Sequence, residues 1–385
     1  MEPPLLYIGL MSGTSMDGVD AVLAAFDATG KPDVIARAHA EIPSELRLEL
    51  LVLNQPGDNE LHRASMAANA LTRVYAKAVE QALSQSDTSA SNVCAIGAHG
   101  QTVRHQPALG YTIQLNAPAL LAELTGIDVI ADFRSRDVAA GGQGAPLVPI
   151  FHQAVFGAES VRVIINLGGI ANITILRPGK TPLGCDTGPA NMLLDLWCQT
   201  HTGAEYDRNG EWSLSGTPRQ DLLDHLILSE PWFAASAPKS TGRDLFNAHW
   251  LNSRLENHAN AMAASGKTPD LLAQDVQATL CQLTACTVAA TIRQLAPDAT
   301  DIIACGGGVR NRALMHQIAL ALPGCDIRST LDEGIDPQDV EALAFAWLAW
   351  AHQRKTAGNI PAVTGASGPR VLGATWPADI RKIQV

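Results

Sequence analysis

The stretch GLMSGTSMDGVDAVL, residues 9–23, joins two apolar segments through a short polar loop rich in Gly, Ser and Thr. Residues 5–11 form an apolar run of strand length, and residues 19–27 are again apolar. Asp17-Gly18 is a dipeptide that favours a tight turn between strands. The stretch therefore predicts two strands joined by a turn, and it raises the question of whether that turn also holds a phosphate group.

The chemistry of this loop suits an anion. Backbone N–H groups in a tight turn form an anion-binding concavity, and glycine lets the backbone approach a ligand closely. Ser12, Thr14 and Ser15 add hydroxyl donors, and Asp17 or Asp20 can hold Mg²⁺ directly or through water. Taken by itself, however, the loop is explained better as a hairpin turn capped by its own hydroxyl groups.

A similar arrangement recurs later in the chain. Residues 161–176 are expected to form an apolar strand, a Gly-Gly turn and a second strand, and residues 301–322 a strand, three glycines and a helix. Two Gly-rich turns in two lobes can clamp a phosphate chain from both sides. The second turn therefore favours phosphate binding by the first.

The chain is predicted to form two α/β lobes, because strands and helices alternate in each half. The composition shifts towards Gly and Pro near residue 145 and near residue 364. We therefore expect lobe I at residues 1–145 and lobe II at residues 146–364, and residues 365–385 could pack back on lobe I. Long helices are expected at 66–84, 275–295 and 337–352, the last with Pro337 at its first helical position.

Composition excludes several classes of protein. The 385 residues carry a formal net charge of −11, which disfavours nucleic acid or an anionic membrane as the main partner. The seven cysteines are odd in number and form no C-x-x-C, so we expect buried thiols of a cytoplasmic protein. The N-terminus lacks a basic region of the signal-peptide type, and no apolar stretch has the length of a membrane span.

The common nucleotide-binding motifs do not occur. The sequence has no G-x-x-x-x-G-K-[ST], and Gly306-Gly307-Gly308 is followed by Val-Arg-Asn, which breaks G-x-G-x-x-G. Three consecutive glycines are nevertheless more than a turn from a strand to a helix needs. This segment is therefore interpreted as a nucleotide contact.

Asp186 is the first candidate for catalysis. It stands in CDTGPAN, before an expected helix that has Pro189 in its first turn. A carboxylate there can be a helix cap, or it can be a general base that the helix dipole keeps ionised. The residues alone leave both roles open.

Other polar segments are candidates for substrate contacts. HGQTVRH offers His99, Gln101 and Thr102 after a strand, where a substrate-recognition loop is preferred to a metal site. Arg134 in ADFRSRD can bind a substrate carboxylate or form a surface ion pair. Glu341 can favour the helix dipole from the first turn or point into a cleft, and the former is slightly preferred on the residues alone.

Eleven strings occur in order over residues 9–367: GLMSGTSMDGVD, HGQT, ADFRSRD, GGQGAPLVP, NLGGIANIT, CDTGPANM, PKSTGRD, DVQATL, CGGGVRN, EALAFAWLAW and VTGAS. This ordered set resembles the anhydro-N-acetylmuramic acid kinase family, which belongs to the actin, hexokinase and heat-shock-chaperone ATPase superfamily. The resemblance implies a two-lobed, actin-like (ribonuclease H-like) α/β fold with an ATP and substrate cleft between the lobes. It also implies a homodimer.

The same resemblance implies a reaction. ATP and Mg²⁺ would convert 1,6-anhydro-N-acetylmuramic acid to N-acetylmuramic acid 6-phosphate, with water opening the anhydro bridge while O6 receives the γ-phosphate. Asp186 matches the base that activates the water, and Glu341 matches an acidic position that contacts the sugar. The implied pathway is murein recycling. The expected ATP contacts are Gly13, Thr14, Ser15, Met16, Asp17, Gly18, Val19, Asp20, Asn166, Gly168, Gly169, Asn172, Gly306, Gly307, Gly308 and Asn311.

The remaining expectations concern the metal, the sugar and the alternatives. Asp17 and Asp20 would serve Mg²⁺, and His99, Gln101, Thr102, Arg134 and Glu341 would contact the sugar. Another small-molecule sugar kinase of the same fold is the alternative within enzymes. A nucleotide-switched regulatory protein is the alternative outside them, and the acidic net charge disfavours its DNA-binding form.

Overall fold

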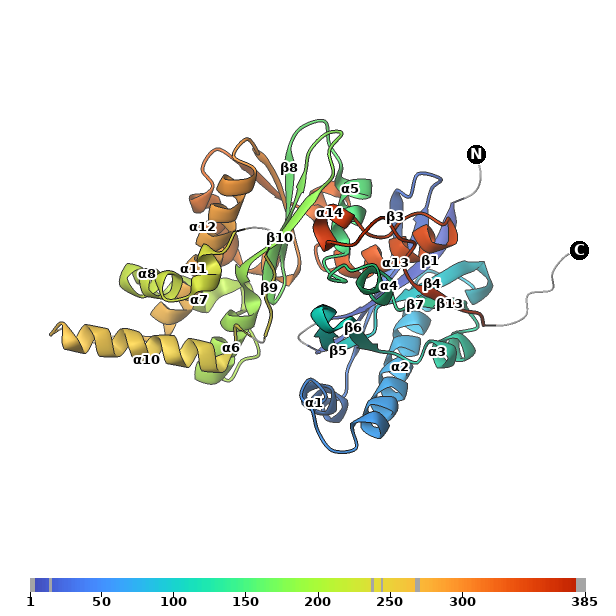
Figure 1. Cartoon of the computed structure of the whole chain (residues 1–385), viewed down its shortest axis with the longest axis horizontal. Coiled ribbons are helices and arrows are strands. Elements are labelled where there is room, and N and C mark those ends of the chain that lie inside the picture. The colour runs from blue at the N-terminus through green and yellow to red at the C-terminus, as the bar shows by residue number, and fades with distance from the viewer. Residues whose placement is uncertain (1–3, 14–15, 237–238, 244, 267–270, 379–385) are drawn as a thin grey trace, which may run out of the picture. The chain divides into compact units, whose positions relative to one another are not determined.

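The computed structural model describes residues 4–13, 16–236, 239–243, 245–266 and 271–378. The chain forms two compact units, of which unit 1 comprises Met1–Phe156 with Asp339–Val385 and unit 2 comprises Gly157–Gln338. Figure 1 shows a sheet with flanking helices in each. The unit boundaries differ from the predicted lobes, since residues 146–156 and 339–364 belong to unit 1.

Unit 1 is built on a sheet with the strand order β13-β7-β4-β1-β2-β3. Strands β1, β2 and β3 are antiparallel neighbours, whereas β1, β4 and β7 run parallel. The short strand β13 closes the edge antiparallel to β7. The strands are β1 (Leu5–Ser12), β2 (Gly18–Phe26), β3 (Pro32–Glu41), β4 (Val93–Ala98), β7 (Val129–Ala131) and β13 (Ala374–Trp376).

Helices pack on both faces of this sheet (Figure 1). The side chains of β1 alternate, so that Ile8 and Leu10 share a core with Leu71 and Tyr75 of α2. Gly9 between them faces α13. The helices are α1 (Ser44–Val52), α2 (Glu60–Gln85), α3 (Pro118–Thr125), α4 (Ser135–Ala139), α5 (Val148–Phe156), α13 (Val340–Gln353) and α14 (Pro361–Thr364), and β5 (Gln101–Gln106) and β6 (Tyr111–Leu115) form a separate hairpin.

Two glycines let α13 lie directly on the sheet. Gly9 of β1 and Gly97 of β4 are partners in the parallel register. A Cβ atom on Gly9 would lie 1.8 Å from the carbonyl oxygen of Ala342, and one on Gly97 would lie 2.0 Å from that of Phe345. This contact of backbone with backbone holds the C-terminal segment in unit 1, which is why the composition shifts did not mark the unit boundary.

The start of α13 also differs from its prediction. The helix begins at Val340, and Pro337 is not its first residue. The carbonyl of Pro337 instead accepts a hydrogen bond of 2.8 Å from the Gly306 amide, within unit 2. Pro337 therefore belongs to unit 2, which ends at Gln338, and α13 starts after the chain has entered unit 1 at Asp339.

Unit 2 repeats the topology of unit 1. Its sheet has the order β10-β9-β8-β11-β12, with β8, β9 and β10 antiparallel and β8, β11 and β12 parallel. This 3-2-1-4-5 order in the chain is the order of β3-β2-β1-β4-β7 in unit 1. The repeated arrangement confirms the predicted actin-like α/β fold. The strands are β8 (Arg162–Leu167), β9 (Ile170–Leu176), β10 (Leu183–Pro189), β11 (Asp301–Cys305) and β12 (Asp326–Ser329).

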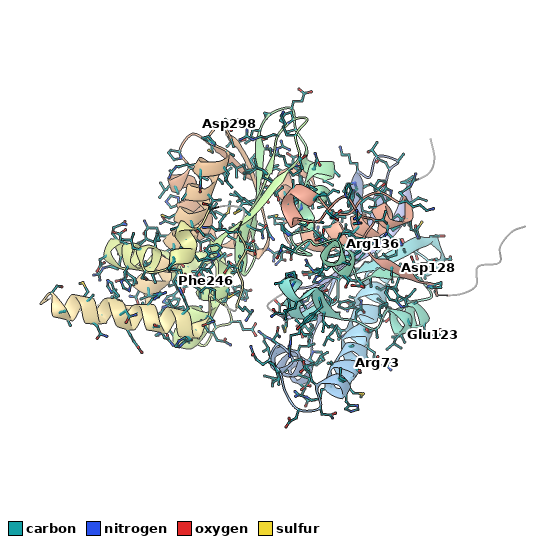
Figure 2. All side chains as sticks on the ribbon, viewed as in Figure 1. Arg73, Glu123, Asp128, Arg136, Phe246 and Asp298 are labelled. Atoms are coloured by element: carbon teal, nitrogen blue, oxygen red, sulfur yellow. The ribbon has the colours of Figure 1, made fainter. Side chains whose placement is uncertain are left out.

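The core of unit 2 lies between its sheet and a layer of helices, among which α11 contributes many of the buried side chains. Phe246, labelled in Figure 2, is fully buried in this core. The helices are α6 (Asn191–Thr202), α7 (Glu211–Ser215), α8 (Gln220–Leu228), α9 (Pro231–Ala234), α10 (Ala248–Ala264), α11 (Ala273–Leu295) and α12 (Arg312–Ala321). Short 3₁₀ segments occur at Ala90–Asn92, Pro107–Leu109, Arg208–Gly210, Gly307–Arg310 and Thr330–Glu333. Among the residues described, no helix combines the length and apolar character needed to cross a bilayer.

Replacing Gly9 with Ala is expected to destabilise unit 1. The added methyl would overlap the Ala342 carbonyl at 1.8 Å, and both groups belong to packed backbone that cannot give way locally. Overpacking of this kind costs about 1–3 kcal/mol or more. Urea unfolding measures the loss. Gly57→Ala is the matched control, because only the end of the Arg63 side chain lies near, at 3.5 Å. Equal stability of the two variants would contradict the close approach.

Candidate active site

Within each unit, the candidate residues gather where parallel strands end. Gly13 follows β1, and His99 follows β4 in unit 1. Gly168 follows β8, and Gly306 follows β11 in unit 2. Ligands of open α/β sheets bind outside the carboxyl ends of the strands. The fold therefore places the two sets of candidates at the edges where such ligands bind.

The strand register brings three candidates of unit 2 into one row. Asn166 of β8 pairs with Asn172 of β9, and Asn172 pairs in turn with Asp186 of β10. Directly paired residues have neighbouring side chains on one face of a sheet. The second hairpin and the proposed base are thus adjacent, although 20 positions separate Asn166 from Asp186 in the sequence.

Asp186 is not a helix cap. It lies inside β10, which continues to Pro189, and α6 starts at Asn191 after Ala190. The structure therefore excludes the helix cap that the sequence left open for Asp186, and the expected placement of Pro189 in the first helical turn is wrong. The pairing of Gly188 and Pro189 with Ala171 and Ile170 extends the strand past the carboxylate, with a register irregularity between Asp186 and Gly188.

The surroundings of Asp186 tune its proton affinity. One carboxylate oxygen, Oδ2, accepts a hydrogen bond of 2.9 Å from the Thr241 amide. The Asp186 amide donates to the Lys239 carbonyl at 3.0 Å. Burial raises the pKa of Asp186 to about 6, and the Thr241 amide partly opposes this rise. The carboxylate is therefore ionised at neutral pH with a proton affinity suited to a general base.

The start of α6 holds the turn of the second hairpin. The Gly168 carbonyl accepts from the Asn191 amide at 3.1 Å, and the Gly169 carbonyl accepts from the amides of Ala190 and Met192. The Asn191 side chain donates to the Leu167 carbonyl at 2.9 Å. The turn is thus fixed by its own helix, which preorganises its backbone.

The three glycines at 306–308 do not share one role. A Cβ atom on Gly306 would lie 2.5 Å from Asn166 Oδ1, and one on Gly308 would lie 2.7 Å from Leu167 Cβ. These two glycines let the loop pack against the second hairpin, so nucleotide contact does not by itself explain them. Gly307 is exposed, and nothing lies nearer than 3.9 Å to the Cβ position. Gly307 is therefore the glycine of this loop with room for a ligand.

Asn311 has a structural role in the same segment. Its Oδ1 accepts a hydrogen bond of 3.0 Å from the Leu314 amide and so caps α12. The side chain is 8% exposed. The cap explains this residue without a nucleotide.

The first hairpin exposes less side-chain chemistry than its sequence indicates. Thr14 and Ser15 lie outside the described residues. The Met16 amide donates to the Gly13 carbonyl at 3.2 Å, which closes the turn. The side chains of Met16 and Val19 are buried in the core of unit 1. Those two residues can therefore offer a ligand only their backbone.

Asp20 has a partner that sequence reasoning missed. Its Oδ1 lies 2.7 Å from Nδ1 of His39, which is its register partner on β3. His39 also occupies the space above Gly18, since a Cβ there would lie 2.2 Å from the imidazole ring. Asp17 is exposed, and its Oδ1 accepts from the Gly18 amide at 3.0 Å. Only the pairing of distant strands could reveal His39.

Three sugar candidates of unit 1 lie together. Arg134 donates from Nε to His99 Nε2 at 3.0 Å, and its Nη1 donates to the Gly144 carbonyl at 2.7 Å. Burial and the Arg134 charge lower the pKa of His99 well below 6.5, so the imidazole is a neutral acceptor. Burial lowers the pKa of Arg134 to about 10, while the charge of Glu341 opposes that shift. Glu341 lies one helical turn before Phe345, whose ring centre is 4.7 Å from that of His99.

Gln101 and Thr102 begin strand β5, where the sequence predicted a loop. Gln101 is buried, and its Oε1 has no hydrogen-bond partner among the described residues. Buried polar atoms are normally paired, so this oxygen is suited to meet a ligand or water. Thr102 Oγ1 accepts from Gln114 Nε2 at 3.1 Å, across the hairpin.

Asp137 was also missed by sequence reasoning. This fully buried carboxylate accepts hydrogen bonds from the Gly144 amide at 2.7 Å, from Asn359 Nδ2 at 2.6 Å and from Thr364 Oγ1 at 2.7 Å. It thereby joins the Gly-rich loop beside Arg134 to the C-terminal segment. Asn359 and Thr364 lie 222 and 227 positions from Asp137 in the chain, so no local pattern could identify the network.

Comparison with known proteins places these features in a family. The model of a family described as anhydro-N-acetylmuramic acid kinase matches residues 5–378. A relative of that name from Bordetella petrii is 57% identical over 376 residues, covering 98% of this chain and 97% of its own. Another from Bordetella pertussis is 58% identical over 376 residues, with the same coverage. A Clostridium difficile activator of 2-hydroxyisocaproyl-CoA dehydratase, solved with bound ADPNP, aligns over 91% of this chain and 96% of its own with TM-score 0.47 and 13% identity.

The two glycine roles predict different results for Ala substitution. Gly306→Ala is expected to lower stability by about 1–3 kcal/mol, because Gly306 has a φ of +84° and its new methyl would meet Asn166. Gly307→Ala is expected to keep the stability of the wild type, because its site is open. Chemical denaturation of the two purified variants tests the difference. A large loss in Gly307→Ala would refute the assigned division of roles.

Proposed function

The chain belongs to the anhydro-N-acetylmuramic acid kinase family, and on that basis we propose that it phosphorylates 1,6-anhydro-N-acetylmuramic acid with ATP. Water opens the 1,6-anhydro ring while O6 receives the γ-phosphate, which yields ADP and N-acetylmuramic acid 6-phosphate. The observation that carries the mechanism is the half-buried Asp186 carboxylate with a pKa of about 6, in one row with Asn166 and Asn172.

Asp186 supplies the base that this reaction requires. A kinase usually removes a proton from an acceptor hydroxyl. The acceptor oxygen is here part of an ether bridge and carries no proton. The base therefore acts on water that attacks C1, and the electron pair of the breaking C1–O6 bond passes to O6 as that oxygen bonds to phosphorus. Asp186 takes the proton of the water.

The Gly-rich turns are proposed to bind the phosphates of ATP. Backbone amides of residues 13–20 would serve one turn and those of residues 166–172 the other, because turn amides bind anions without a side chain. The open face of Gly307 would receive part of the nucleotide. Asn311 contributes by fixing the start of α12 rather than through a direct contact.

We propose that Asp20, with Asp17, holds Mg²⁺ directly or through water. Mg²⁺ is commonly bound by one or two carboxylates together with water and substrate phosphates. The two residues fit that pattern, since both are carboxylates, Asp17 is exposed and the Asp20 side chain is 45% exposed. When bound with ATP, Mg²⁺ neutralises phosphate charge. His39 orients the Asp20 carboxylate towards this role.

The sugar is proposed to be recognised by five residues of unit 1: Arg134, Glu341, His99, Gln101 and Thr102. The Arg134 guanidinium is suited to the lactyl carboxylate of the muramic acid, because it donates in a planar fork. Neutral His99 accepts from Arg134 and directs that fork. The Gln101 oxygen is available to a substrate hydroxyl or amide. We further propose action as a cytoplasmic homodimer in murein recycling, without a nucleic acid or membrane partner.

Turnover in ¹⁸O-labelled water tests the reaction. We expect one labelled oxygen at C1 of the product and none in the phosphate, because water attacks carbon while phosphorus is attacked by O6. Mass spectrometry of promptly reduced product locates the label. Preformed unlabelled product in the same water corrects for exchange at C1. Label in the phosphate would exclude the scheme, and equal turnover of free N-acetylmuramic acid would favour another sugar kinase.

Asp186→Asn is expected to fold and to bind both ligands while kcat falls by roughly 10²- to 10⁴-fold, since the base is lost. In the wild type, kcat is expected to fall as the pH decreases through about 6, because Asp186 becomes protonated. Steady-state kinetics from pH 5 to 9 measure both effects. Asp298→Asn, an exposed acidic residue labelled in Figure 2, is the matched control and should keep full activity.

The same variant has an expected stability signature. The folded-state pKa of Asp186 is raised above its usual 3.8, so the folded protein loses stability as the pH rises through about 6. Asp186→Asn removes this half-buried charge and should melt at a higher temperature than the wild type at pH 8. The difference in melting temperature between the variant and the wild type should become smaller at lower pH, where Asp186 of the wild type is protonated. Full activity of Asp186→Asn would exclude Asp186 as the base.

A further inference from the structure

Residues 239–241 form a short backbone brace along Asp186. The Lys239 carbonyl accepts from the Asp186 amide at 3.0 Å, and the Thr241 amide donates to Asp186 Oδ2 at 2.9 Å. The brace therefore contacts both the backbone and the reacting group of the proposed base. Its own position controls the hydrogen bond that the carboxylate receives.

The Lys239 side chain anchors this brace to α9. Its Nζ donates to the carbonyls of Trp232 at 3.0 Å and Phe233 at 2.8 Å, and it lies 4.2 Å from the centre of the Trp232 ring. A cation is favoured both by carbonyls at the end of a helix and by an indole face. The ammonium group is thus bound to α9 by two hydrogen bonds and one ring contact, which gives it a structural role.

The Trp232 side chain forms a second link between α9 and the brace. Its Nε1 donates to the Ser240 carbonyl at 3.0 Å. Helix α9 is itself fixed, because Glu230 Oε1 accepts from the Trp232 amide at 3.1 Å and Glu230 Oε2 accepts from Trp250 Nε1 at 2.9 Å. Phe233 packs on the buried Phe246, with ring centres 5.5 Å apart. The anchor is therefore continuous with the core of unit 2.

We propose that Lys239 and Trp232 are positioning residues for Asp186: they hold residues 239–241 so that the Thr241 amide stays on the Asp186 carboxylate. This inference rests on the proposed role of Asp186 as the base. Neither side chain is assigned a contact with substrate, and both act through the backbone of the brace.

The chemical consequence is a control on the pH range of the reaction. A hydrogen bond to the ionised form of a carboxyl lowers its pKa. Loosening the Thr241 amide removes that stabilisation, so the proton is lost only at higher pH. Two titratable groups lie close by, the Cys185 thiol and the Lys239 ammonium. Burial raises the pKa of Cys185 and lowers that of Lys239.

The test compares kcat–pH profiles of Lys239→Met and Trp232→Phe with that of the wild type. Lys239→Met keeps the aliphatic stem and removes the ammonium. Trp232→Phe removes the donor to Ser240 and replaces the indole face under the Lys239 ammonium with a smaller phenyl face. We expect the acid limb of Lys239→Met, which is the fall of kcat towards low pH, to move up by about one pH unit. In this variant kcat at pH 6 should then be about one tenth of kcat at pH 9, compared with about one half in the wild type. Trp232→Phe should shift the limb in the same direction by a smaller amount, with no change in charge. Lys239→Arg should restore part of the wild-type profile.

Trp197→Phe is the matched control. Its Nε1 also donates to a backbone carbonyl in unit 2, that of Ala273 at 2.8 Å, and its ring packs on His201 rather than on residues 239–241. Its acid limb should stay at the wild-type position. A shift in Lys239→Met without one in Trp232→Phe would point to the lost charge and overturn the positioning role.

Other outcomes separate this inference from the function itself. If Asp186→Asn is inactive and the wild-type limb lies near pH 6, but both positioning variants keep that limb, the positioning role fails and the base assignment stands. If Asp186→Asn keeps its activity, the base assignment fails and this inference fails with it. Should Lys239→Met not fold, the limb of Trp232→Phe alone decides, and an unshifted limb overturns the proposal.

Discussion

The direct contact of α13 with the sheet of unit 1 is the constraint on which much else depends. Gly9 and Gly97 stand side by side in β1 and β4, and each leaves room only for a backbone carbonyl of the helix. This contact returns the C-terminal segment to the N-terminal unit. It places Glu341 at the start of a buried helix and Phe345 against His99. The buried Asp137 then ties residues 359–364 to the loop beside Arg134, so the sugar candidates depend on a helix that is remote in sequence.

Unit 2 uses close approach for a different purpose. Gly306 and Gly308 allow the loop after β11 to lie on the hairpin of β8 and β9. Backbone amides at the start of α6 donate hydrogen bonds to the carbonyls of the same hairpin turn. Two loops at the carboxyl ends of parallel strands are thereby fixed relative to each other. The register across β8, β9 and β10 then aligns Asn166, Asn172 and Asp186. A phosphate-binding turn and a base become neighbours through ordinary strand pairing.

The charged groups of the two units are tuned in opposite ways. Asp186 is half-buried, and the loss of water contact raises the pKa of its carboxyl to about 6, while one amide opposes the rise. Arg134 remains charged beside a histidine that burial and the arginine keep neutral. The first arrangement suits proton removal near neutral pH, and the second suits a fixed hydrogen-bond acceptor. Burial is the leading cause in both, and the sign of its effect follows from the charge of the ionised form.

The sequence by itself determined the hairpins, the alternation of strands and helices, the long helix near residues 275–295 and the family. These features are written in local apolar patterns, turn residues and an ordered set of motifs, which need no knowledge of distant contacts. Only the tertiary structure decided that β10 runs through Asp186, that two glycines of 306–308 serve packing, and that residues 339–364 belong to unit 1. It alone revealed His39, Asp137 and the Thr241 amide as partners. Each of these depends on burial and strand pairing between residues far apart in the chain, and such contacts leave no periodic trace in the local sequence.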